Sequence, residues 1–209
     1  MTMTDWTPAE RALFQRLDTP FKVQLYLNRL GYDPAYGTRS PRWIIRENKA
    51  NCFEGALLAA AILGFHGRPR LLLDLWSEND DDHVLAVFRR GGCLGAVAKS
   101  NFTTLRFREP VYRTLRELVM SYFDVYFNTV GEKSLREYSR PMSLARFDRR
   151  HWMTTEEDIG YIGDALNRLK HTRILSPGQV ARLEPVDKDV FRAGMLVSVK
   201  AGLFKAKKS

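Results

Sequence analysis

The sequence has few cysteines and no long apolar run. Cys52 and Cys93 are its two cysteines and form no CxxC pair, which argues against a disulfide framework and a zinc knuckle. In a reducing compartment both are expected to be free thiols. The longest apolar run covers residues 55–65 and falls well short of the roughly 20 residues of a membrane-spanning helix. We therefore expect no membrane span.

The first residues also lack a basic stretch followed by an apolar one, the pattern of a secretory signal, so we expect a cytoplasmic protein. The 209 residues are 44% hydrophobic and 27% charged, which is ordinary for a globular protein with one core. The formal charge of +9 would attract nucleic acid or acidic protein without specifying a function. We expect a single domain over 1–199, made of N-terminal helices (1–48), a core (49–109) and a C-terminal helical region (110–199), and then a frayed basic tail (200–209).

Helix starts are the clearest local signals. Thr7, Thr19 and Ser40 each precede a proline, so that the hydroxyl can cap a helix whose first position the proline takes. A fourth helix is predicted after Asn51, because Glu54 follows three residues later and the two can form a capping box. This fourth helix is apolar on all sides up to residue 65, which is typical of a helix enclosed by the core.

A change of pattern after this helix predicts strands. The apolar stretch RLLLDLW ends at Trp76, and HVLAVFRR and CLGAVAKSN flank the dipeptide GG, as in a tight β-hairpin. Helical periodicity returns from Pro110 to residue 128 and again from Thr154, with a connecting region between them. The sequence therefore predicts an α+β fold, in which a central cysteine-bearing helix packs on a short antiparallel sheet between N- and C-terminal helices.

Cys52 is predicted to occupy the first position of that central helix. The unpaired amides and the positive end of the helix dipole should lower the pKa of its thiol below the reference of about 8.5. A thiolate nucleophile needs an imidazole as its base and a third group that orients the imidazole. His83 begins the second predicted strand; a three-residue hairpin turn places Asn101 opposite it, and a two-residue turn places Ser100 there. The alternative is that Cys52 is a small buried apolar residue, which is the usual role of a free cysteine.

These motifs resemble a known family. NCFEGALLAAAILGFHGRPRLLLDLW, DDHVLAVF and GAVAKSN look like the papain-like core of the transglutaminase-like superfamily of cysteine enzymes, and residues 19–148 are similar to a family of uncharacterised bacterial transglutaminase-like proteins. The resemblance implies Cys52 as nucleophile, His83 as general base and later acid, and Asn101 as the group that orients the imidazole. It also implies a cysteine-dependent amide-bond hydrolase or acyltransferase with a thioester intermediate, a peptide or amide substrate, and neither cofactor nor metal.

The sequence departs from the papain pattern upstream of the cysteine. Papain-like enzymes carry a Gln of the oxyanion hole six residues before the nucleophile, where this chain has Arg46. Trp43 and Asn48 are the candidates for the missing donor. Because inactive relatives keep the core motifs, the alternative function is a binding module that uses its basic surface for an acidic protein or nucleic acid. The substrate, the choice of water or amine as acceptor and the oligomeric state stay open.

The acidic stretch SENDDD is expected to be a solvated turn, since it lacks the Gly and Glu of a calcium-binding loop. Asp80 to Asp82 should favour cationic substrates and raise the pKa of His83. The spacing of the cysteines and histidines, Cys93 and His66 included, fits no zinc pattern.

A basic series follows the predicted hairpin. We expect it to be a solvated face paired with Glu109 and Glu117 rather than a nucleic-acid site. Its members are Arg106, Arg108, Arg113 and Arg116.

Overall fold

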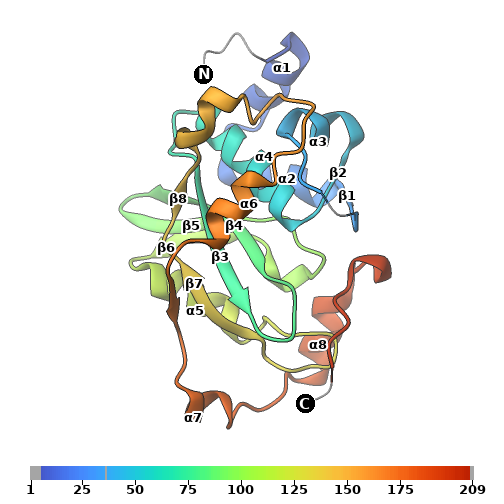
Figure 1. Cartoon of the computed structure of the whole chain (residues 1–209), viewed down its shortest axis with the longest axis vertical. Coiled ribbons are helices and arrows are strands. Elements are labelled where there is room, and N and C mark those ends of the chain that lie inside the picture. The colour runs from blue at the N-terminus through green and yellow to red at the C-terminus, as the bar shows by residue number, and fades with distance from the viewer. Residues whose placement is uncertain (1–5, 36, 208–209) are drawn as a thin grey trace.

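An antiparallel sheet of seven strands crosses the middle of the molecule (Figure 1). The structure is a computed structural model that describes residues 6–35 and 37–207. The strands follow the order β6-β5-β4-β3-β7-β9, with β8 beside β3, and β1 and β2 form a separate parallel pair. Their bounds are Gly31–Tyr32 (β1), Lys49–Ala50 (β2), Leu71–Ser77 (β3), His83–Arg90 (β4), Cys93–Val97 (β5), Arg108–Tyr112 (β6), Leu135–Ser139 (β7), Met142–Ser143 (β8) and His171–Arg173 (β9).

The N-terminal helices begin where the Ser/Thr–Pro pairs predict. In each, the Ser or Thr hydroxyl accepts a hydrogen bond from a backbone amide of the first turn, and proline follows directly. The capping box before the central helix is also confirmed: the Glu54 amide donates to Asn51 Oδ1 over 2.9 Å, and the Asn51 amide donates to Glu54 Oε2 over 3.1 Å. These helices are α1 (Pro8–Arg16), α2 (Pro20–Arg29), α3 (Pro41–Glu47) and α4 (Cys52–Phe65).

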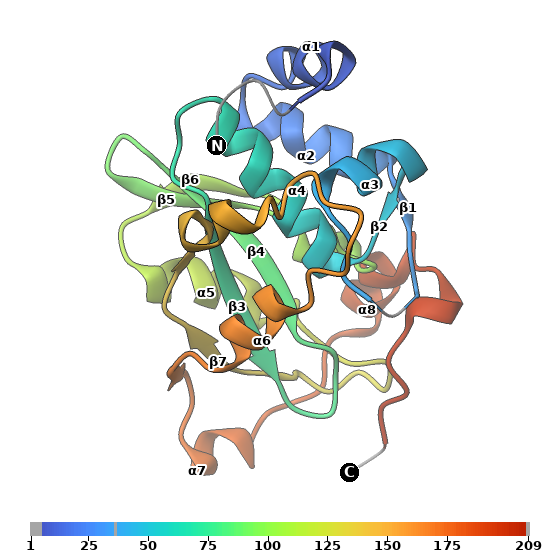
Figure 2. The ribbon, with the colours of Figure 1, turned by 45° about the horizontal axis from the view of Figure 1, so that its top comes forward.

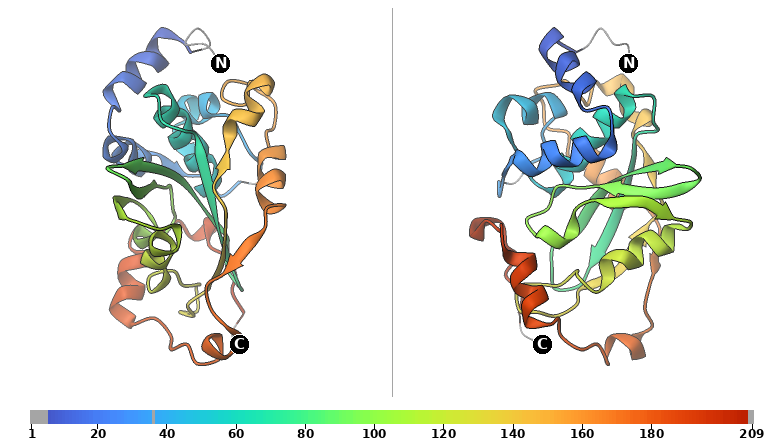
Figure 3. Two further views of the ribbon diagram at one scale, coloured as in Figure 1. Left: turned by 90° about the vertical axis from the view of Figure 1, so that its left-hand side faces the viewer. Right: turned by 180° about the vertical axis from the view of Figure 1, so that it is seen from behind.

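The sheet separates two apolar cores. Alternate residues of β4 point to opposite faces, so that Val84 and Ala86 pack with α4 while Leu85 and Val87 pack in the second core. The second core also holds the buried face of α5 (Leu115–Phe123). Seen from behind, α2 and α5 lie on opposite sides of the strands (Figure 3). As predicted, α4 is enclosed, with every residue from 54 to 63 buried.

The hairpin of β4 and β5 has a two-residue turn. Gly91 and Gly92 both have positive φ, at 58° and 79°, a conformation that glycine adopts without strain. Arg90 pairs with Cys93, and the paired ladder ends where Ala86 faces Val97. The three-residue alternative, which set Asn101 opposite His83, is therefore wrong. Ser100 would follow in the observed register, but β5 ends three residues before it.

The C-terminal half contains more strand than the periodicity predicts. The helix expected from Pro110 is wrong in its first part, because residues 108–112 form the edge strand β6, where proline is tolerated. The helix starts only at Leu115. Thr114 is its N-cap, and the Thr114 hydroxyl accepts a hydrogen bond from the Glu117 amide. The helix expected from Thr154 is reduced to α6 (Tyr161–Asn167), and the connecting region holds β7, β8 and the 3-10 segment η3 (Leu144–Arg150).

The basic tail is ordered up to residue 207. After α7 (Pro177–Val180) and α8 (Lys188–Met195), the short turn η4 (Lys200–Gly202) leads into an extended stretch. In Figure 2 this part of the chain passes beside β1. We name residues 199–207 the C-terminal segment. The expectation of a frayed tail is wrong for these residues. Residues 208 and 209 of the predicted tail lie outside the described residues. In the described part of the chain, no helix is both long and apolar enough to cross a membrane.

Candidate active site

A small cavity lies where α4 and β4 begin. Its volume of about 30 Å³ is room for one or two water molecules. Cys52, His83, Ser100 and Asn101 all contribute to its wall, so the fold gathers the residues that the sequence nominated as nucleophile, base and orienting group. The remaining wall comes from the acidic loop, from Tyr32, Phe102, Leu105 and Tyr126, and from Gly202 and Phe204 of the C-terminal segment.

Cys52 is the first residue of α4, and its thiol meets the start of β4. Sγ lies 3.8 Å from the carbonyl oxygen of Asp82, to which the thiol donates. Burial of the sulfur raises the pKa of Cys52 to about 12, and the charge of Asp81 adds to the rise. Backbone amides of Phe53 and Val84 hydrogen-bond to the sulfur and act in the opposite direction, but they are outweighed. The expected lowering of the thiol pKa by the helix start is thus wrong, because desolvation is the larger effect.

His83 is the first residue of β4, and its ring is buried. Nε2 donates to the carbonyl oxygen of Leu105 over 2.7 Å, which fixes the tautomer because a carbonyl oxygen can only accept. Burial, together with the smaller effect of the charge of Arg108, lowers the pKa of His83 to about 4. The imidazole is therefore neutral at pH 7, with the proton on Nε2 and a free lone pair on Nδ1. The predicted rise in its pKa from the acidic loop is wrong.

The thiol and the imidazole reach the cavity from different sides of β4. Cys52 contacts the backbone of the residues on either side of His83, whereas the His83 ring lies 6.4 Å from the ring of Tyr126 on the face of the second core. Within the described residues no hydrogen bond joins Sγ to the imidazole. Both residues line the cavity.

No model of a known protein family matches this chain. A search of curated proteins also finds no match.

Asn101 does not hold the imidazole in this structure. Its Oδ1 accepts from the Val199 amide over 2.8 Å, and its Nδ2 donates to the carbonyl oxygens of Val199 and Gly202, each over 3.0 Å. Among the described residues no hydrogen bond joins Ser100 to the imidazole either, and the Ser100 hydroxyl accepts from the Phe102 amide. The orienting role predicted for a side chain at 100 or 101 falls to the backbone carbonyl of Leu105.

The candidates for the second oxyanion donor lie elsewhere. Trp43 stacks under the guanidinium of Arg39, 3.9 Å from ring centre to Cζ, and Asn48 ends α3 in the left-handed conformation. Neither lines the cavity. Arg46, at the position of the papain glutamine, forms surface ion pairs with Glu47 and Glu156.

Two tyrosines of the cavity were not singled out from the sequence. Tyr32 belongs to β1. Burial raises the pKa of its hydroxyl, and the charges of Cys52 and of the nearby carboxylates raise this pKa further. Tyr126 donates its hydroxyl to the carbonyl oxygen of Asp81 over 2.8 Å. In the sequence Tyr32 stands between Gly31 and Asp33, and Tyr126 stands between two apolar residues, so nothing local marks either as a site residue.

The acidic loop is less solvated than expected. The Ser134 hydroxyl donates to Asp80 Oδ2 over 2.6 Å, and the Ser77 amide donates to Asp82 Oδ1 over 2.7 Å. Partial burial raises the pKa of Asp80 to about 7 and that of Asp82 to about 6. In the described part of the chain no three His, Cys, Asp or Glu side chains are arranged to hold a metal ion.

The basic series after the hairpin is tied down within the chain. Arg108 stacks on Tyr122, 3.8 Å from Cζ to the ring centre, and Arg116 donates to the carbonyl oxygen of Ile174 over 3.3 Å. Among the described residues no ion pair reaches Glu109 or Glu117, and the expected pairing is wrong. Glu117 instead accepts from the backbone amide of Arg113 over 2.9 Å. These internal partners reduce what the series can offer to nucleic acid.

Proposed function

We propose that the protein is a cysteine-dependent amide-bond hydrolase or acyltransferase, with Cys52 as nucleophile and His83 as general base. The observation that carries the proposal is that Cys52 and His83 line one cavity, and that the Leu105 carbonyl holds the proton of the imidazole on Nε2 and so leaves Nδ1 unprotonated. The sequence resemblance to transglutaminase-like enzymes points the same way. The proposal includes a papain-like core, in which the cysteine-bearing helix packs on the sheet that carries the histidine.

The chemistry starts from a neutral pair. The thiol turns from the Asp82 carbonyl toward the imidazole, and Nδ1 takes its proton as Sγ attacks the carbonyl carbon of a bound amide. An S–C bond forms, the C–N bond breaks, and the departing amine receives the proton from His83. Water or a second amine then displaces the sulfur from the thioester. The Leu105 carbonyl keeps the ring in the required tautomer throughout.

The test is acylation by p-nitrophenyl acetate, which needs no natural substrate. At pH 8 we expect an acetyl group on Cys52, located by peptide mass spectrometry, together with release of p-nitrophenolate. His83→Gln keeps a donor for the Leu105 carbonyl but has no basic nitrogen, and we expect it to acetylate at least about 100-fold more slowly. Cys93→Ser, a change at the exposed hairpin, should leave the rate unchanged.

Equal acetylation of the wild-type protein and His83→Gln would remove the basis of the enzyme proposal. The alternative, a binding module, would then be tested by measuring how strongly the protein is retained on immobilised DNA. Retention that vanishes at moderate salt is non-specific attraction of a basic protein.

A further inference from the structure

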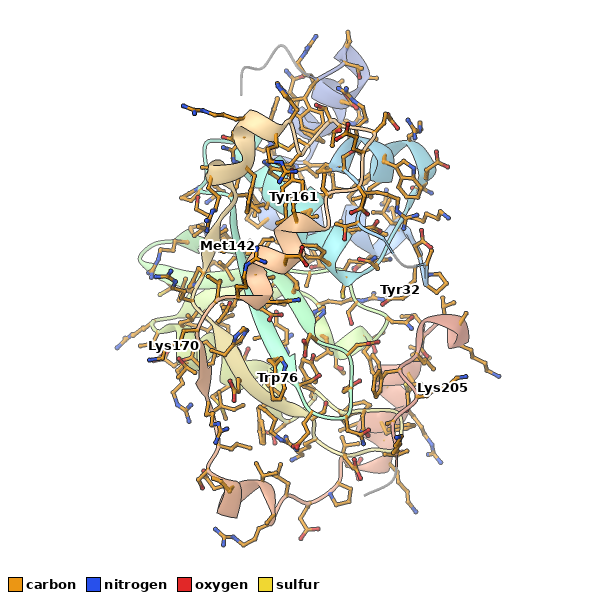
Figure 4. The ribbon with its side chains drawn as sticks, viewed as in Figure 1. Tyr32, Trp76, Met142, Tyr161, Lys170 and Lys205 are labelled. Atoms are coloured by element: carbon orange, nitrogen blue, oxygen red, sulfur yellow. The ribbon has the colours of Figure 1, made fainter. Side chains whose placement is uncertain are left out.

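The C-terminal segment closes the candidate active site. Gly202 and Phe204 form part of the cavity wall, together with Cys52 and His83. Figure 4 labels Tyr32 of β1 and Lys205 of the segment on the same side of the molecule. The segment and the thiol therefore border the same cavity.

The segment is held by its main chain. The side chain of Asn101 binds both the amide and the carbonyl of Val199. The side chain of Asn79 does the same for Lys207: its Oδ1 accepts from the Lys207 amide over 3.0 Å, and its Nδ2 donates to the Lys207 carbonyl oxygen over 2.6 Å. Between the two, the Thr129 hydroxyl donates to the carbonyl oxygen of Phe204 over 2.9 Å. The stretch turns at Lys200–Gly202 and has no regular secondary structure after it, and side chains bind its main-chain groups at three points. Such an arrangement is a receptor for peptide backbone.

No strand of the sheet takes part in this hold. Among the described residues, every backbone–backbone hydrogen bond of the segment stays local, from Gly202 to Val199 and from Leu203 to Lys200. Val199 and Phe204 are each more than a third exposed. The segment is thus bound as a ligand is, and is not woven into the sheet.

One position of the segment requires glycine. A Cβ on Gly202 would lie 2.5 Å from Cε1 and 2.8 Å from Cδ1 of Tyr32, closer than real contacts allow. The close approach brings the main chain against the wall that Cys52 shares. The groove therefore accepts a residue without a side chain at this point.

The charges of segment and groove are complementary. Lys200, Lys205 and Lys207 are basic, while the loop at the cavity carries Asp80, Asp81 and Asp82. A cationic ligand fits this loop, in agreement with the preference expected from the sequence.

We propose that the groove beside Cys52 is a binding site for a cationic peptide that places a glycine at the cavity wall, and that residues 199–207 occupy it in this chain. The proposal deepens the proposed function, and it rests on that function only in taking such a peptide as substrate. The peptide-binding site itself can be tested without turnover.

The first experiment releases the segment in the full-length chain. In Gly202→Val the new side chain collides with Tyr32, and we expect iodoacetamide to alkylate Cys52 at least tenfold faster than in the wild-type protein. The matched control is Gly178→Val, since a Cβ there has only the tip of Arg182 within 4 Å, at 3.8 Å, and we expect no change. Mass spectrometry resolves Cys52 from Cys93, whose rate serves as an internal reference. Thr129→Val, which removes one hydroxyl, gives a second and milder release.

The second experiment returns the ligand in trans. A fluorescein-labelled peptide of residues 196–207, LVSVKAGLFKAK, should bind Cys52→Ser/Gly202→Val at least tenfold more tightly than Cys52→Ser alone, as measured by fluorescence polarisation. Peptides with glutamate for the three lysines, or valine for the glycine, should bind at least tenfold more weakly than the parent. The unlabelled parent peptide should also slow alkylation of Gly202→Val.

The proposal is overturned if neither Gly202→Val nor Thr129→Val accelerates alkylation, or if the peptide binds both Cys52→Ser proteins equally or not at all. Its failure is separate from that of the proposed function. If the peptide binds but Gly202→Val shows no acetylation that depends on His83, the peptide-binding groove stands and the enzyme proposal fails. Acetylation without peptide binding would do the reverse.

Discussion

The two sides of the cavity are built in different ways. The inner side consists of Cys52 and His83 at the starts of α4 and β4, in elements that the two cores bury. The outer side is the C-terminal segment, which hydrogen bonds from the side chains of Asn101, Thr129 and Asn79 hold in place. Regions with few buried contacts open at low free energy while core elements open only with the whole fold. The difference teaches that access to the thiol can change without any change in the groups around it.

The largest effect is expected from breaking the inner side at the helix start. Glu54 is fully buried, and its carboxylate accepts from the Asn51 amide, from the Arg39 amide and from Arg39 Nε, the last over 2.7 Å. Glu54→Ala leaves these donors unpaired, and we expect the free energy of unfolding to fall by about 3–5 kcal/mol in urea denaturation. Glu156→Ala breaks the exposed pair with Arg46 and should change little. A loss at Glu54 no greater than at Glu156 would mean that the helix start does not hold the thiol in place.

Next in size is the pH dependence of stability. The pKa of His83 is about 4 when folded and 6.5 when unfolded, so the unfolded chain binds the extra proton and stability rises between pH 4 and 6.5 by up to about 3 kcal/mol. Asp80 acts in the opposite sense. Its pKa is raised to about 7, so the folded chain keeps the proton and stability falls between pH 4 and 7. The two neighbours on the inner side therefore oppose each other.

Two variants separate these contributions. His83→Gln should make the change in unfolding free energy from pH 4.5 to 7 more negative than in the wild-type protein, and Asp80→Asn should make it more positive. Urea denaturation at the two pH values measures both changes. Shifts of the same sign in the two variants would contradict the assignment of their pKa values.

The third effect concerns the thiol itself. With a pKa near 12, Cys52 has far less thiolate at pH 7.5 than a free cysteine, and only part of this is regained through higher intrinsic nucleophilicity. We expect the wild-type protein to react with iodoacetamide at Cys52 on the order of 100-fold more slowly than N-acetylcysteine. The rate should climb with pH through pH 10. A plateau between pH 6 and 8 would instead indicate a thiolate–imidazolium pair.

Features fixed by near neighbours could be predicted from the sequence. The capping box joins Asn51 to Glu54, three residues apart, so the start of α4 and the place of Cys52 in it follow from local hydrogen-bond chemistry. The hairpin turn is likewise set by Gly91 and Gly92, and the sequence narrowed its register to two choices.

Features that depend on distant residues could not be predicted. Asn101 binds Val199, 98 residues away, and no local pattern marks that partnership. The pKa values of Cys52 and His83 went the wrong way for the same reason, since the residues that bury them come from several elements. In the C-terminal half, Pro110 lies in an edge strand that only pairing with β5 specifies.

The smallest change in stability is expected at the far end of the C-terminal segment. Asn79 has a φ of 56°, so Asn79→Gly keeps the backbone conformation and removes only the side chain that binds Lys207. Asn48→Gly is the matched control, because Asn48 has a φ of 54° and its side chain does not touch the segment. Both variants should unfold within about 1 kcal/mol of the wild-type protein. Only Asn79→Gly should speed amide hydrogen exchange at Lys207, followed by mass spectrometry of C-terminal peptides. Equal exchange in the two variants would mean that the segment is held by something other than these side chains, and the contrast between the two sides of the cavity would fail.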